Sequence, residues 1–151
     1  MRWACVPFGE LSVPQLYAVL ALRSEVFVVE QNCVFLDIDG VDPQTWHLLG
    51  TGDDGALKAY ARLLPPGIKS PTDAVIGRVV TSPAARSGGM GRALMTEALV
   101  HCQRLWPEHA ITLHAQARLQ RFYGSFGFVQ VAQPYMEDGI LHIEMRKENR
   151  A

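Results

Sequence analysis

The stretch that decides the fold is Val79-Val-Thr-Ser-Pro-Ala-Ala-Arg-Ser-Gly-Gly-Met-Gly-Arg-Ala-Leu94. It begins as an apolar strand-like run, passes through a glycine-rich turn and continues with the apolar spacing of a helix. Amides at the start of a helix have no partner within it, and the helix dipole adds partial positive charge there. Because glycines let a ligand approach the backbone, this turn is a candidate phosphate or pyrophosphate site.

Two common phosphate-binding motifs do not fit this turn. A P-loop requires Lys and then Ser or Thr after its last glycine, whereas Gly91 is followed by Arg92 and Ala93. A dinucleotide fingerprint requires Gly or Ala where this chain has Leu94. A plain strand-to-helix connection, in which the glycines serve only the turn, stays open at this point.

Hydrophobic patterns on both sides of the turn predict a mixed α+β chain without internal repeats. Ser12 can cap a helix that has Pro14 in its first turn, and Gln15 can complete a capping box. This helix should reach about residue 29, with Arg23 and Glu25 on its polar face. Further helices are expected at 88–105 and 119–126, and strands at 3–8, 46–50, 57–64, 75–81, 111–115, 128–131 and 140–145.

Length and composition fit one ordinary globular domain. The chain has 151 residues, of which 48% are hydrophobic and 19% charged, and a formal net charge of -1. The absence of a broad basic face argues against a nucleic-acid partner, and no run approaches the length of a membrane span. We therefore expect a cytoplasmic protein without a membrane partner. Three cysteines without C-x-x-C spacing and histidines without H-E-x-x-H spacing predict no metal site.

The glycine turn resembles the R/Q-x-x-G-x-G/A motif of the Gcn5-related N-acetyltransferases (GNAT) at Arg86-Ser-Gly-Gly89-Met-Gly91. A later tyrosine matches that family in Phe122-Tyr-Gly-Ser-Phe-Gly127-Phe128. The likeness spreads over nearly the whole chain towards the ElaA-like proteins. It is carried by Leu22-Arg-Ser-Glu-Val-Phe-Val-Val-Glu-Gln-Asn-Cys33, Asp37-Ile-Asp-Gly40, Arg78-Val-Val-Thr-Ser-Pro83 and Glu137-Asp-Gly139.

This resemblance implies one acyl-CoA N-acyltransferase domain over residues 1–151. Its expected fold is a mixed, mostly antiparallel twisted sheet of about seven strands flanked by about four helices, splayed between the strands ending near Thr81 and Gln116. The strand before the turn should end in a bulge whose amides meet the acyl carbonyl and pantetheine. The residues expected to bind acetyl-CoA are Val79, Val80, Thr81, Arg86, Ser87, Gly88, Gly89, Met90, Gly91, Arg92, Gln116, Phe122 and Tyr123.

The resemblance also implies a catalytic role for Tyr123, as the general acid that protonates the departing thiol. The other interpretation of Tyr123 is an ordinary half-buried tyrosine beside two phenylalanines. A general base must deprotonate the amine, and Glu30 is preferred among the acids, with His47 a second choice that is otherwise structural. The full set of candidate bases is Glu30, Asp37, Asp39, His47, His114, Glu137 and His142.

The expected activity is transfer of an acetyl group from acetyl-CoA to the amine of a small molecule or peptide, by direct attack in a ternary complex. The alternative is a non-catalytic acyl-CoA-binding sensor or interaction module, and a third hypothesis is a nucleotide-binding protein. The acidic turn at residues 37–42 either attracts a cationic amine or is a solvated loop. The terminal hairpin leaves a strand edge through which a homodimer can form.

Overall fold

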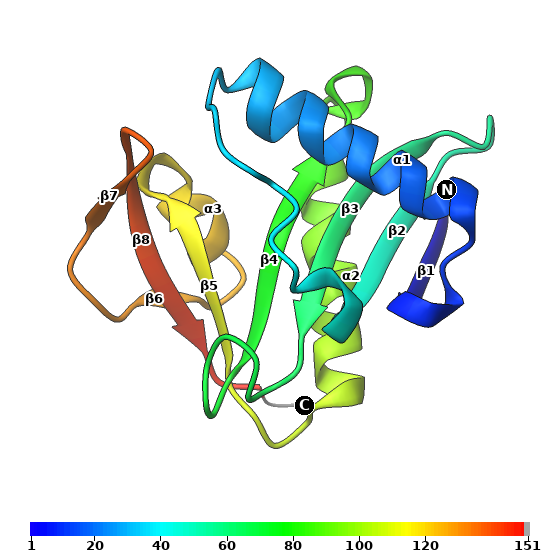
Figure 1. The fold of residues 1–151 in the computed structure, drawn as a ribbon. Helices are drawn as coiled ribbons and strands as arrows, with labels where there is room; N and C mark the ends of the chain where they lie inside the picture. The colour runs from blue at the N-terminus through cyan, green and yellow to red at the C-terminus, as the bar shows by residue number, and fades with distance from the viewer. Residues whose placement is uncertain (150–151) are drawn as a thin grey trace.

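The computed structural model describes residues 1–149 of the chain. These residues form eight strands and three α-helices (Figure 1). In chain order they are β1 (Arg2–Pro7), α1 (Val13–Arg23), β2 (Trp46–Thr51), β3 (Leu57–Leu64), β4 (Ala74–Thr81), α2 (Met90–Leu105), β5 (Ile111–Gln116), α3 (Gln120–Gly124), β6 (Val129–Gln130), β7 (Tyr135–Glu137) and β8 (Ile140–Lys147).

All strands belong to one sheet, in the order β1-β2-β3-β4-β5-β8-β6, with β7 also pairing with β8. Every pairing is antiparallel except that of β4 with β5, which is parallel. These two strands pair only where Ala74 meets Ile111 and Val75 meets Thr112, and Figure 1 shows them separating beyond that point. The predicted mixed, mostly antiparallel and splayed sheet is therefore confirmed.

The numbers of elements differ slightly from the prediction of about seven strands and four helices. The additional strand, β7, has three residues, too few to show an alternating pattern, and it pairs with β8 across a turn at Asp138 and Gly139. Both turn residues have positive φ, 51° and 76°, as a tight two-residue hairpin turn requires. The structure has three α-helices in place of about four, and the first of them continues directly into a π-helical segment, Ser24–Glu30.

Helix α1 begins with the capping box expected from the sequence. The backbone N–H of Gln15 donates to Ser12 Oγ at 3.1 Å, and the N–H of Ser12 donates to Gln15 Oε1 at 2.8 Å. The apolar side of the helix packs Val19 and Leu22 against the sheet. Arg23 was expected on the polar face, and that prediction was wrong: its side chain is completely buried, because acidic partners later in the chain enclose it.

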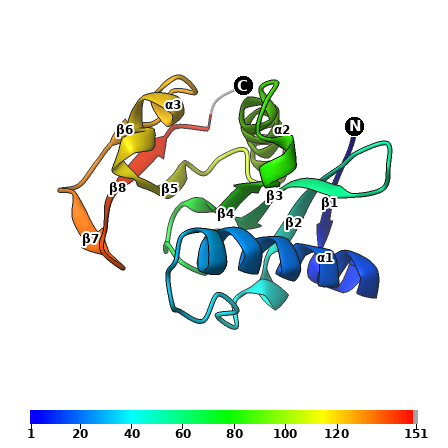
Figure 2. The ribbon, with the colours of Figure 1, turned by 90° about the horizontal axis from the view of Figure 1, so that it is seen from above.

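The two long helices lie on opposite faces of the sheet (Figure 2). Leu94 and Ala98 of α2 belong to the larger apolar core together with Ile76 of β4. Val80, on the same strand, belongs instead to the core under α1. Strand β4 is thus packed on both faces, also beyond the point where it leaves β5. No helix within residues 1–149 has the length and hydrophobicity needed to span a bilayer.

Candidate active site

A cleft of about 1010 Å³ occupies the space where β4 and β5 diverge. At its closed end, Asp73 accepts hydrogen bonds from Thr112 Oγ1 at 2.7 Å and from Arg146 Nε at 2.8 Å. These bonds connect the start of β4 to β5 and β8, so the two halves of the sheet are fixed where the cleft begins. Of the residues predicted to bind acetyl-CoA, those that line the cleft are Val79, Val80, Thr81, Arg86, Gln116 and Tyr123.

Strand β4 contains the bulge expected from the family resemblance. Tyr60 of β3 pairs with Val80 and Arg62 pairs with Gly77, so two steps along β3 match three steps along β4. The extra residue is in the segment at Arg78, whose φ is 51°. A side chain in this left-handed region costs roughly 1–2 kcal/mol, and such strain is concentrated at functional sites. The bulge removes regular pairing to β3 immediately before the cleft-lining residues 79–81.

The glycine turn leads directly into α2. Gly88 and Gly89 both have positive φ, 82° and 79°, and Gly89 caps the helix. Apart from the adjoining backbone, no protein atom lies within 4 Å of the position that a Cβ would take on either residue. The backbone therefore borders open space, next to helix-start amides that suit an anionic group such as a pyrophosphate.

The remaining residues predicted to bind acetyl-CoA form this turn or lie beside it, and they do not line the cleft. Arg92 lies over the ring of Phe126 at 4.7 Å and over that of Phe122 at 6.0 Å, and it donates to Ser125 Oγ at 3.2 Å. These contacts connect the first turn of α2 to α3. The other residues of this group are Ser87, Gly88, Gly89, Met90 and Gly91.

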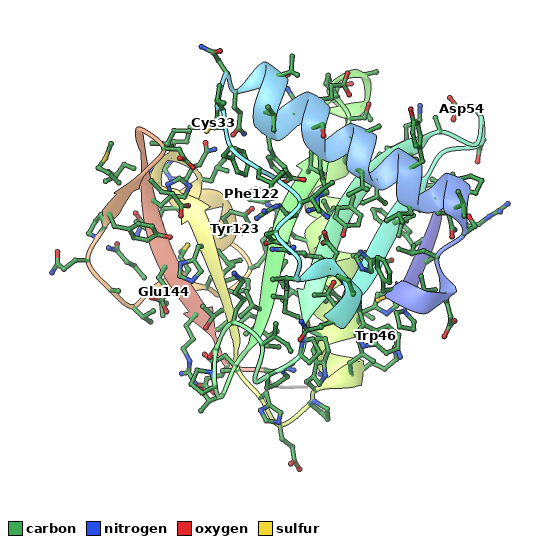
Figure 3. The ribbon with its side chains drawn as sticks, in the orientation of Figure 1. Cys33, Trp46, Asp54, Phe122, Tyr123 and Glu144 are labelled. Carbon is green, nitrogen blue, oxygen red and sulfur yellow. The ribbon has the colours of Figure 1, made fainter. Side chains whose placement is uncertain are left out.

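Tyr123 projects from α3 towards the cleft (Figure 3). It is 6% exposed and packs edge-on against Phe122 and Phe128, with ring centroids 5.1 and 6.4 Å away. Burial raises the pKa of Tyr123 to about 12. Its hydroxyl therefore keeps its proton at neutral pH, as a proton donor must.

Glu30 lines the cleft but is bound by Arg86 across its mouth. Arg86 Nη1 is 2.8 Å from Glu30 Oε2, and Nη2 contacts the other carboxylate oxygen. These bonds hold the pKa of Glu30 below its ordinary value. A carboxylate stabilised in this way is a poor acceptor for an amine proton.

His47 is fully buried and is not part of the cleft wall. Its Nε2 lies 3.0 Å from the carbonyl oxygen of Asp42, which can only accept, so Nε2 carries the proton. Nδ1 then accepts from the Tyr60 hydroxyl at 2.6 Å. Burial lowers the pKa of His47, and both ring nitrogens are engaged. This arrangement is that of a structural histidine, so His47 has no part in the function proposed below.

The acidic turn at residues 37–42 is exposed at residues 38–40, but its carboxylates are paired with arginines and are not free to bind an amine. Arg23 donates to Asp37 Oδ2 and to Asp42 Oδ1, both at 2.8 Å. Arg62 donates to both oxygens of Asp39, at 2.9 and 2.6 Å, and these bonds lower the pKa of Asp39. We call this group the Asp–Arg cluster; its members are Arg23, Asp37, Asp39, Asp42, Arg62 and Arg78.

The Asp–Arg cluster also holds the bulge of β4. Arg78, the residue with positive φ, donates through Nε to Asp37 Oδ1 at 2.7 Å and through Nη2 to the Asp37 carbonyl at 2.9 Å. Within residues 1–149, Arg62 Nε is the only buried side-chain nitrogen or oxygen without a partner, so every other buried polar side-chain atom of the cluster is paired. The buried charges therefore connect α1, the loop after it and the strained strand.

Some cleft residues had no signal in the sequence, because nothing local distinguishes them from ordinary surface residues. Arg118, for example, follows β5 and donates to Gln116 Oε1 at 3.1 Å. The others of this kind are Phe35, Arg62 and Tyr135. Among the described residues, no group of three or more His, Cys, Asp or Glu side chains is arranged to hold a metal ion.

Comparisons with known proteins agree with this geometry. Residues 44–149 match the family model of the acetyltransferase (GNAT) domain. The chain is 49% identical to protein ElaA of Escherichia coli (strain K12), over 98% of this chain and 97% of that protein. The crystal structure of Escherichia coli ElaA matches with a TM-score of 0.91 and 48% identity, over 97% of this chain and 99% of that chain.

A second solved structure, that of an acyl-CoA N-acyltransferase from Pseudomonas aeruginosa, matches with a TM-score of 0.92 and 48% identity. The alignment covers 97% of this chain and 98% of that chain. The family model spans the bulge of β4, the glycine turn and α3, but not the part of the cleft wall that residues 26–39 form. The family predicted from the sequence is confirmed: this chain belongs to the GNAT acyltransferase family and, within it, to the ElaA-like proteins.

Proposed function

We propose that the protein transfers an acetyl group from acetyl-CoA to the amine of a small molecule or peptide, within a single domain spanning residues 1–151. The observation that carries the proposal is the arrangement of the cleft. One wall has a bulged strand held by buried charges, the other side has a protonated tyrosine, and the glycine turn directly follows Arg86, which lines the cleft. Each of these features matches one requirement of acyl transfer from a thioester.

In this mechanism the glycine turn and the start of α2 bind the pyrophosphate, and the backbone amides of residues 79–81 polarise the thioester carbonyl. A neutral amine attacks the carbonyl carbon and forms a C–N bond. The resulting tetrahedral intermediate collapses with cleavage of the C–S bond. The departing CoA thiolate takes a proton from the hydroxyl of Tyr123, which is buried beside the cleft and retains its proton at neutral pH.

Calorimetric titration with acetyl-CoA tests the first half of this proposal. We expect binding on the order of micromolar, and ATP and NAD should not compete. Gly89→Ala should weaken binding by at least about tenfold, the equivalent of roughly 1.4 kcal/mol, because its Cβ would occupy the space against the helix start.

Gly55→Ala is a matched control for this measurement. Gly55 has a φ of 82°, and no atom lies within 4 Å of its Cβ position either, but it belongs to the turn between β2 and β3. It therefore carries the same conformational strain without a role in the cleft. Equal acetyl-CoA affinity for the two variants would show that the glycine turn does not hold the ligand.

A further inference from the structure

The proposed reaction requires a base, and most candidates in or near the cleft are already engaged. Glu30 is paired with Arg86, and Asp37 and Asp39 belong to the Asp–Arg cluster. The wall formed by β5, β7 and β8 is different. Its titratable side chains have no Arg or Lys partner within the part of the chain that the structure describes; those that line the cleft are His114, Glu137, Asp138 and His142.

We propose that His142 is the general base that takes the proton from the acceptor's ammonium group, an inference that rests on the acyl transfer proposed above. His142 Nδ1 lies 2.8 Å from the carbonyl oxygen of Ile140. A carbonyl oxygen can only accept a hydrogen bond, so Nδ1 carries the ring proton. The neutral ring therefore has its lone pair on Nε2, and the hairpin itself fixes the tautomer that a base needs.

The position of the His142 ring is fixed as well. The ring stacks on that of Tyr135, with centroids 5.7 Å apart and an interplanar angle of 24°. Its side chain is 14% exposed, and the residue lines the cleft. Because His142 pairs with Gln116 at the end of β5, it lies at the level where β4 and β5 are already separated.

Glu137 is placed to stabilise the protonated form of this histidine. Its Oε2 is 3.8 Å from His142 Nε2, too far for a hydrogen bond that would occupy the lone pair, and close enough to attract an imidazolium. Tyr135 lies on the same side, with Glu144 and His114 around it. Burial, with Glu137 and then Glu144 adding to the effect, raises the pKa of Tyr135, so this hydroxyl stays neutral beside the ring.

His114 is less suited to this role because its tautomer is not fixed: its Nδ1 faces a hydroxyl, which can donate or accept, and not a carbonyl. It lies 2.9 Å from the Tyr135 hydroxyl, and its strand position is two residues nearer the closed end of the cleft than Gln116.

Both protons that leave the ammonium nitrogen in this reaction can be accounted for. The ammonium gives one proton to His142 Nε2, and the neutral amine then attacks the thioester carbon. His142 releases this proton to solvent. The second proton leaves the nitrogen as the tetrahedral intermediate collapses, and through solvent it replaces the one that Tyr123 gives to the thiolate. The net products are the amide, free CoA thiol and one proton.

The test compares His142→Gln with His109→Gln, using the alkylamine or lysine peptide that gives the fastest thiol release with the wild-type protein. His109 is a matched control because its Nδ1 also bonds a backbone carbonyl, that of Thr72 at 2.9 Å, but it is exposed and does not line the cleft. We expect His142→Gln to lower kcat at pH 7 on the order of 100-fold. Its affinity for acetyl-CoA and the kcat of His109→Gln should stay at the wild-type values.

The pH dependence separates a base from a merely structural residue. The deficit of His142→Gln should shrink as the pH rises towards the pKa of the acceptor amine, because the amine then needs no base. A kcat equal to that of the wild type, or a loss in His114→Gln in its place, would overturn the assignment of His142 and leave the acyl transfer intact. Absence of thiol release in the wild-type protein would refute the proposed function itself, and the base with it.

Discussion

Tyr123→Phe is expected to lower kcat on the order of 1,000-fold while leaving the affinity for acetyl-CoA nearly unchanged. The substitution removes only the hydroxyl, so the edge-on packing against Phe122 and Phe128 is retained. Without this proton donor, the thiolate must leave unprotonated or take its proton from water. Steady-state kinetics gives kcat, and calorimetry gives the dissociation constant for acetyl-CoA.

Tyr17→Phe is the control for this experiment. Tyr17 is 78% exposed on α1 and should lose its hydroxyl without any effect on kcat. Because the pKa of Tyr123 is about 12, the wild-type rate should not fall through ionisation of this tyrosine anywhere near neutral pH. If Tyr123→Phe keeps the full kcat with an unchanged pH profile, Tyr123 is an ordinary buried tyrosine and another group protonates the thiolate.

Arg23→Ala is expected to lower the free energy of unfolding by about 3–5 kcal/mol. Arg23 has no exposed surface, and its guanidinium holds both Asp37 and Asp42. Its removal leaves buried carboxylates with fewer partners, and Asp37 also anchors the strained Arg78. Urea unfolding followed by circular dichroism measures the change.

Two further variants make this result interpretable. Arg23→Lys keeps the charge but loses the planar fork that contacts two aspartates, so its loss of stability should be smaller and measurable even if Arg23→Ala does not fold. Arg2→Ala removes an exposed arginine from β1 and should change the stability by less than about 0.5 kcal/mol. A loss below about 1 kcal/mol for Arg23→Ala would mean that the Asp–Arg cluster contributes little to the fold.

The parts of the fold that could be predicted are those formed by residues close together in the sequence. Ser12 and Gln15 are three residues apart, and their capping box forms as expected. The glycine turn is contiguous, and both its position and its entry into α2 agree with the prediction. Such features depend on neighbours within one or two turns of chain, which a single sequence shows directly.

The parts that could not be predicted depend on partners far along the chain. The charge of Arg23 predicts an exposed side chain, whereas its burial requires Asp37 and Asp42, 14 and 19 residues later. Likewise, Arg86 reaches back 56 residues to Glu30, which changes that carboxylate from a candidate base into half of an ion pair. Long-range pairing decides which charges stay free, and free charges decide the chemistry of the cleft.

The most direct test of the proposed function is the release of free CoA thiol from acetyl-CoA, followed with and without a broad panel of small amines and peptides. We expect at least one amine to raise thiol release well above the rate without an acceptor, and mass spectrometry should find the corresponding acetylamide. If acetyl-CoA binds but no amine in the panel raises thiol release, the protein is a binding module and the proposed acetyl transfer is wrong.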